Sequence, residues 1–116
     1  MVDDLDLLRD FAKTFLEASG MTVMVAACGK EALQILEKEK GAVDILFTDY
    51  SMPGINGSDL IEQVAVRWPH IRPVLASGYL DDLVLKRLKE LNTKVLSKPY
   101  EMQEAAKLLI DLLPKP

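Results

Sequence analysis

A mostly apolar run over residues 43–48 ends in Asp49, and a turn rich in glycine, proline and asparagine follows it. Such a run is typical of a strand buried on both faces, as in a parallel sheet covered by helices. A side chain at the carboxyl end of that strand stands in the crevice where α/β proteins bind ligands. The sequence therefore predicts that the Asp49 carboxylate is placed for chemistry.

Other polar residues also stand where apolar segments end. Asp3 and Asp4 follow the first two residues, and Ser77 and Lys98 each close a short apolar segment. If these segments are parallel strands of one sheet, three carboxylates, a hydroxyl and an ammonium meet at one edge. Crowded carboxylates repel one another and call for a hard divalent cation, of which magnesium (Mg²⁺) suits them best. The lysine beside them would partner an incoming anionic group.

The remaining pattern alternates between helices and strands. Apolar spacing predicts helices over residues 5–20, 30–38, 58–69, 80–91 and 102–114, and further strands over residues 22–26, 73–77 and 94–97. Ser58 is a plausible N-cap for the third helix. Strands that alternate with helices of about 10 to 15 residues favour right-handed crossovers and a parallel sheet. We expect one α/β domain over residues 1–116.

Composition narrows the classes of partner. The chain has 116 residues, 49% of them hydrophobic, which suffices for one core. Its net charge of -4 argues against a nucleic-acid surface, which would need clustered lysine and arginine. A single cysteine, Cys28, excludes a disulfide framework, and no apolar run approaches about 18 residues. We expect a cytoplasmic protein without signal peptide, membrane or nucleic-acid contact.

Four motifs together resemble the receiver domain of bacterial two-component response regulators. They occupy residues 2–4, 48–57, 76–79 and 97–100, in the family's order and spacing. The resemblance implies a flavodoxin-like, doubly wound fold with helices on both faces and strand order 2-1-3-4-5. That order would bring Asp3 and Asp4 beside Asp49.

The resemblance also implies roles for the residues of this site. Asp49 would accept a phosphoryl group, and Asp3 and Asp4 would hold Mg²⁺ with Asp49 and the main-chain carbonyl of Ser51. Such a carboxylate nucleophile needs a metal and a cation to screen it from the phosphoryl oxygens.

Two more residues would act on the phosphoryl group itself. Lys98 matches the lysine that pairs with it, and the family has a cis peptide bond between that lysine and Pro99. Ser77 matches the hydroxyl that moves toward the phosphoryl oxygens after transfer. The implied donor is a phosphohistidine on a histidine kinase or phosphotransfer protein, and the output partner is unknown. The chain would assist its own phosphorylation and would not turn over an external substrate.

Several alternatives stay open at this point. Asp49 could be an ordinary turn residue, and Asp3 and Asp4 could cap the first helix. The domain could be a pseudo-receiver, an interaction module of this fold that is never phosphorylated. It could also be a phosphatase with an aspartyl-phosphate intermediate, but Tyr50 and Ser51 offer no general acid of the carboxyl type.

Two departures from the family pattern are visible. Val95 stands where many receivers carry an aromatic residue that turns inward on activation, so output could run through Tyr79, Tyr100 or the backbone instead. Only Met1 and Val2 precede the acid pair, although a strand usually needs around five residues. We therefore expect a truncated first strand. Upstream residues, or a segment exchanged with another chain in a homodimer, would fill the resulting slot.

Overall fold

The computed structural model describes residues 1–114. Within these residues, a pair of helices is followed by three strands that alternate with three further helices. The elements are α1 (Asp6–Ala18), α2 (Gly29–Lys38), β1 (Ile45–Asp49), α3 (Gly57–Arg67), β2 (Arg72–Ser77), α4 (Asp82–Glu90), β3 (Lys94–Ser97) and α5 (Met102–Leu112). No helix among the described residues is both long and apolar enough to cross a membrane.

The sheet is parallel, with β2 between β1 and β3. Val2 lies on the free side of β1, where it bridges in parallel to Thr48 and, on its other side, to Ala26. The order across the sheet thus follows the predicted 2-1-3-4-5. This arrangement confirms the predicted α/β fold.

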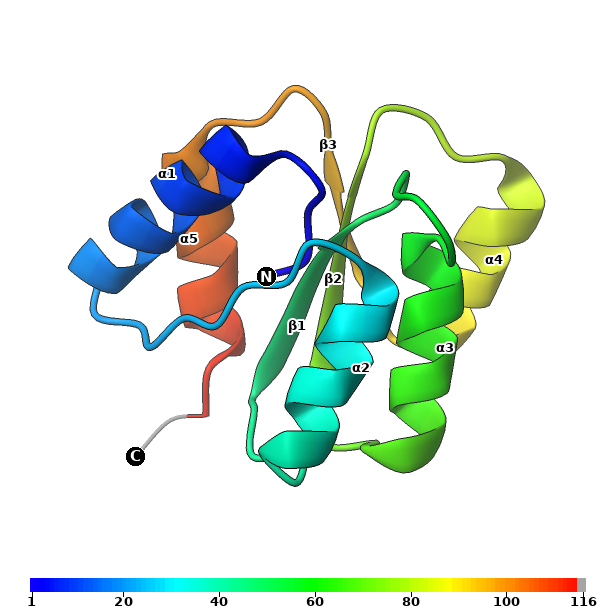
Figure 1. Cartoon of the computed structure of the whole chain (residues 1–116). Helices are drawn as coiled ribbons and strands as arrows, with labels where there is room; N and C mark the ends of the chain where they lie inside the picture. Colours follow the sequence, from blue (N-terminus) through cyan, green and yellow to red (C-terminus); the bar gives the residue numbers. More distant parts are fainter. Residues whose placement is uncertain (115–116) are drawn as a thin grey trace.

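Helices cover both faces of the sheet, with α1 and α5 on one face and α2, α3 and α4 on the other (Figure 1). Side chains alternate between the faces along β1, so Leu46 packs in the core beneath α2 and α3 and Phe47 packs in the core beneath α1 and α5. Burial on both faces explains why the sequence of β1 is a nearly continuous apolar run.

The strand predicted over residues 22–26 is wrong in this structure. Only Ala26 of that segment pairs, through its bridge to Val2, and the residues before it are not in a strand. The expected truncation of the first strand explains this result, because Val2 alone pairs there. A segment without a neighbouring strand has no ladder of hydrogen bonds to hold it extended.

The N-cap predicted for α3 is also wrong. The cap is Asn56, whose Oδ1 accepts hydrogen bonds from the Asp59 N–H at 2.9 Å and from the Ser58 hydroxyl at 2.8 Å. Ser58 lies inside the first turn and is buried. The helix ends at Arg67, just before Trp68 and Pro69, and α4 begins at Asp82 because Asp81 caps it.

Replacement of Asn56 by alanine should lower the free energy of unfolding by about 1 kcal/mol, because two donors at the start of α3 lose their acceptor. Urea denaturation of Asn56→Ala and Asn56→Ser would measure the effect. Serine can still cap, so it should retain most of the stability. Equal stability of wild type and Asn56→Ala would contradict this assignment.

Candidate functional site

Three carboxylates converge at the carboxyl edge of the sheet. Asp49 is the last residue of β1, and Asp3 and Asp4 follow Val2, which lies beside β1. One carboxylate oxygen from each of the three residues lies within 4.8 Å of the others. The backbone fixes this grouping, because the Asp49 N–H donates to the Val2 carbonyl at 3.0 Å.

Asp49 lies in the interior of this cluster. Its side chain is only 8% exposed, and its Oδ1 forms an ion pair with Lys98 Nζ at 2.5 Å. That oxygen is buried, and its polar partner among the described residues is the Lys98 ammonium. A buried carboxylate oxygen beside two more carboxylates suits the oxygen-only coordination that Mg²⁺ prefers. The residues present therefore fit a magnesium ion.

Asp3 is buried and is held by two hydrogen bonds. Its Oδ1 accepts a hydrogen bond from the Leu5 N–H at 2.9 Å, and its carbonyl oxygen accepts one from Arg9 Nη1 at 2.7 Å. Burial raises the pKa of the Asp3 carboxyl above its ordinary value, and the negative charge of Asp49 acts in the same direction. The hydrogen bond from Leu5 opposes that rise. A cation that bound here would relieve the repulsion between the carboxylates.

Ser77 and Lys98 are joined through their backbones. Ser77 ends β2 one residue beyond Ala76, which lies opposite Asp49, and its carbonyl accepts the Lys98 N–H at 2.9 Å. Its hydroxyl donates to the Tyr79 carbonyl at 3.1 Å. The hydroxyl is thus engaged with its own turn and not with Asp49. The Lys98–Pro99 peptide bond is cis.

Tyr100 lies close to the acids, and the sequence did not assign it a place in the site. Its ring lies 6.0 Å from that of Phe47, measured between centroids, and burial raises the pKa of its hydroxyl to about 12, with contributions from the charges of Asp3 and Asp49. The phenol stays neutral and can only donate or accept hydrogen bonds near these carboxylates.

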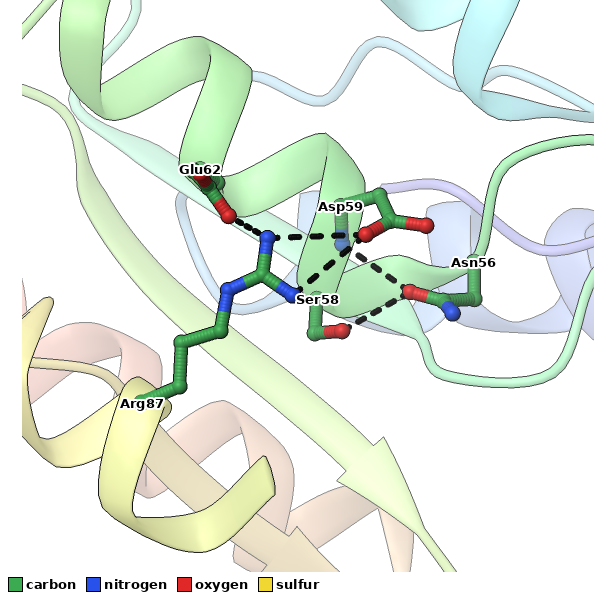
Figure 2. Close-up of polar contacts among 5 residues, drawn as sticks. All are labelled: Asn56, Ser58, Asp59, Glu62 and Arg87. Atoms are coloured by element: carbon green, nitrogen blue, oxygen red, sulfur yellow. Dashed lines mark hydrogen bonds and ion pairs between the residues drawn. The ribbon is translucent and has the colours of Figure 1, made fainter. Parts of the chain in front are cut away.

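One arginine forms ion pairs between α3, which follows the Asp49 loop, and α4, which follows the Ser77 loop. Arg87 of α4 lies between Asp59 and Glu62 of α3, with Arg87 Nη1 3.4 Å from Asp59 Oδ1 and a close ion pair to Glu62 (Figure 2). All three side chains are at least 40% exposed, so the pairs are screened by salt. They link α3 to α4.

Besides Tyr100, two contributors to the site were missed from the sequence. Thr48 is fully buried, and its hydroxyl donates to the Asp49 carbonyl oxygen at 2.9 Å. Arg9 holds the Asp3 carbonyl and also pairs with Asp6. Arg9 lies six residues after Asp3, on α1 three residues after Asp6, and that spacing is the signal that could have revealed it.

Three further polar residues take different positions relative to the acids. Ser51 is exposed in the loop after β1, two residues beyond Asp49. Cys28 is the N-cap residue of α2. His70 precedes β2, and its Nε2 lies 2.7 Å from the Gly41 carbonyl oxygen, so it belongs to the opposite end of the sheet.

The chain is similar to known signalling proteins. It is 33% identical over 116 residues to the sensor kinase CckA of Brucella abortus, covering 99% of this chain and 12% of that protein. It is 27% identical over 110 residues to the DNA-binding transcriptional regulator NtrC of Escherichia coli, covering 94% of this chain and 23% of that protein. The chain thus spans less than a quarter of either relative.

Solved structures give the same result. A crystal structure of the receiver domain from the hybrid histidine kinase CckA matches with a TM-score of 0.81 and 31% identity, covering 97% of this chain and 95% of that one. A response regulator receiver domain from Clostridium thermocellum matches with a TM-score of 0.86 and 26% identity, covering 96% of this chain and 89% of that one. The family model described as response regulator receiver domain matches residues 1–110. The chain belongs to the response regulator receiver domain family.

Proposed function

We propose that this receiver domain accepts a phosphoryl group on Asp49, with Mg²⁺ bound, and passes the resulting change to an output partner. The observation that carries this proposal is the cluster of three carboxylates within 4.8 Å of one another, with Lys98 Nζ 2.5 Å from Asp49. Asp3, Asp4 and Asp49 would hold the metal, together with the Ser51 carbonyl. The ion would neutralise carboxylate charge that otherwise repels a phosphoryl donor.

The transfer itself asks little of the protein beyond position and charge. An Asp49 carboxylate oxygen attacks phosphorus, the new O–P bond forms, and the P–N bond to the partner's histidine breaks with its electron pair leaving on the imidazole. Lys98 would then pair with the phosphoryl oxygens. The domain acts once per phosphorylation and is not proposed to turn over an external substrate.

The surface beside the acids suits a protein donor. Leu5, just before α1, and Leu7 and Phe11, in the first half of α1, have exposed side chains on the segment that follows Asp3 and Asp4. A group of exposed apolar side chains of this kind marks a contact surface. We propose that the histidine kinase or phosphotransfer protein docks there and brings its phosphohistidine to Asp49.

The test is addition of beryllofluoride, which mimics the aspartyl phosphate, with Mg²⁺ to isotopically labelled protein. Amide NMR shifts should appear in the loop after β1 and in residues 77–84. A pseudo-receiver would show no response, and that result would overturn the proposal in favour of the interaction module. Beryllofluoride without Mg²⁺ is the matched control.

Loss of the Lys98 ammonium should slow phosphorylation by roughly 10- to 100-fold, because a charge-assisted contact to the phosphoryl oxygens disappears. Intact-mass measurement after addition of acetyl phosphate and Mg²⁺ would follow the time course in Lys98→Ala. Lys94→Ala provides the control, since that lysine is exposed at the start of β3. Equal rates in the two variants would remove Lys98 from the mechanism.

Ser77→Ala should separate the response from the uptake of phosphate. The Ser77 hydroxyl now bonds to the Tyr79 carbonyl, so its move toward a phosphoryl oxygen would free the segment before α4. Mg²⁺ affinity should stay near that of the wild type, while the amide shifts in α4 after beryllofluoride addition should shrink. Ser97→Ala, in the residue opposite Ser77 on β3, is the control. Identical α4 shifts in wild type and Ser77→Ala would exclude this role.

A further inference from the structure

Asp3 and Asp4 occupy the short connection between Val2 and α1. On this connection the Asp3 N–H donates to the Ala26 carbonyl at 3.1 Å. Asp4 is exposed, whereas Asp3 and Asp49 are buried. An exposed side chain is not held by packing, so the place of the Asp4 carboxylate in the cluster depends on the backbone that carries it. The peptide unit between the two acids is the part of that backbone that links their positions.

Arg9 anchors this peptide unit. Its Nη1 donates to the Asp3 carbonyl oxygen at 2.7 Å, and its Nη2 pairs with Asp6 in the first turn of α1. The side chain is only 15% exposed. Because a peptide unit is planar, a hold on its carbonyl oxygen also fixes the direction in which the chain enters Asp4. Arg9 thus restrains the two carboxylates relative to each other.

The contribution of Arg9 to the acid cluster is one of position. Its carboxylate partner is Asp6, which lies outside the cluster, whereas Lys98 supplies the ion pair to Asp49. A guanidinium presents its donors in a rigid fork, so it can hold two acceptors at once in a fixed arrangement. Here the two acceptors are the Asp3 carbonyl and the Asp6 carboxylate, which ties the connection to the start of the helix.

Divalent cations differ in how far they depend on such restraint. Mg²⁺ demands a nearly ideal octahedral set of oxygen ligands, whereas the larger Ca²⁺ accepts flexible arrangements and varied ligand numbers. Loosely held carboxylates should therefore lose more affinity for Mg²⁺ than for Ca²⁺. Removal of a group that holds a metal ligand in place typically lowers metal affinity by about 10- to 100-fold.

We propose that Arg9 is a positioning residue that gives the acid cluster its preference for Mg²⁺ over Ca²⁺, by holding the peptide unit between Asp3 and Asp4. This role rests on the proposed function, in which Asp3, Asp4 and Asp49 hold the metal. Arg9 itself supplies no ligand. Its loss leaves the three carboxylates and Lys98 in the chain but frees the connection before α1 to change direction.

The test compares the metal affinities of Arg9→Met and the wild type. Methionine keeps much of the buried apolar stem and removes the guanidinium. Metal-free, isotopically labelled protein is titrated with magnesium chloride and, separately, with calcium chloride at constant ionic strength, and the amide shifts of Asp3, Asp4 and Asp49 give each Kd. The affinity for Mg²⁺ should fall roughly tenfold. The affinity for Ca²⁺ should fall less, so the preference for Mg²⁺ should shrink.

Arg72→Met is the matched control. Arg72 Nη1 also donates to a main-chain carbonyl, that of Leu112 at 3.1 Å, and Arg72 begins β2 at the end opposite Ser77. The control removes the same charge and the same kind of hydrogen bond, and it should leave the metal preference unchanged.

Arg9→Lys separates charge from position. It keeps the positive charge, but one ammonium does not reproduce the fork that spans the Asp3 carbonyl and Asp6. The preference for Mg²⁺ should shrink in this variant too. If circular dichroism shows that Arg9→Met does not fold, the lysine variant decides the question.

An unchanged preference in the Arg9 variants would overturn this role for Arg9. Equal losses of affinity for the two ions would also overturn it, because they would indicate a general loosening of the fold, as would an equal effect in Arg72→Met. A preference retained in Arg9→Lys alone would assign the effect to charge and would contradict a role in positioning. The beryllofluoride response of the wild type tests the proposed function separately. If the wild type responds, these results concern Arg9 alone, whereas a wild type that binds neither ion nor beryllofluoride would exclude both proposals.

Discussion

Asp49→Asn is expected to abolish phosphorylation by acetyl phosphate in the presence of Mg²⁺. The amide is not a nucleophile toward phosphorus, and it also removes a charge that pairs with Lys98 Nζ at 2.5 Å. Wild-type protein should gain one phosphoryl adduct as acetate leaves with the electron pair of the broken P–O bond. Intact-mass measurement would show this adduct and its loss in the variant.

Asp44→Asn is the matched control for this experiment. Asp44 precedes the first residue of β1 and is exposed, and the same chemical change is made there at the opposite end of the strand from Asp49. It should leave the adduct unchanged. An adduct of equal size on Asp49→Asn would show that another group accepts the phosphate, and the assignment of the acceptor would then be wrong.

The convergence of the acids could be predicted from the sequence because a strand that is buried on both faces has a recognisable, nearly continuous apolar sequence. Residues 43–48 form an apolar run that a two-sided parallel strand requires, and parallel strands bring their carboxyl ends to one edge. The strand order that the family resemblance implied set Val2 beside β1, and that adjacency made Asp3 and Asp4 neighbours of Asp49. The structure places the three carboxylates together.

The errors arise where local geometry decides between similar residues. Ser58 and Asn56 are both good N-caps by type, and only the path of the loop after β1 placed Asn56 at the cap. The segment of residues 22–26 has strand-like composition, but a strand forms only where a partner offers hydrogen bonds. Thr48 supports the site through a single bond to a backbone oxygen, which no periodic pattern reveals, whereas Arg9 could have been found from its spacing after Asp6.

The start of α3 is tightly packed against the carboxyl end of β1. Gly57 begins α3, and its N–H donates to the Tyr50 carbonyl at 2.8 Å. A Cβ built at this position would overlap the Asp49 carbonyl oxygen and would lie 2.5 Å from Leu75 Cδ1 and 3.0 Å from the Tyr50 Cα. Two of these neighbours are backbone atoms of the sheet edge, which cannot move aside as a flexible side chain can.

Gly57→Ala should therefore destabilise the fold by about 1–3 kcal/mol through overpacking. It should also displace Asp49, the candidate phosphoacceptor. Gly78→Ala is the control, because a Cβ there meets no atom within 4 Å. Thermal and urea denaturation of the two variants would measure the free energy of unfolding. Titration with Mg²⁺ would measure the affinity of the acid cluster for the metal, which depends on the positions of the carboxylates. We expect both the stability and the Mg²⁺ affinity to fall in Gly57→Ala alone. If Gly57→Ala were as stable as Gly78→Ala, the loop would be looser than its contacts with Asp49, Tyr50 and Leu75 indicate, and α3 could shift without moving β1.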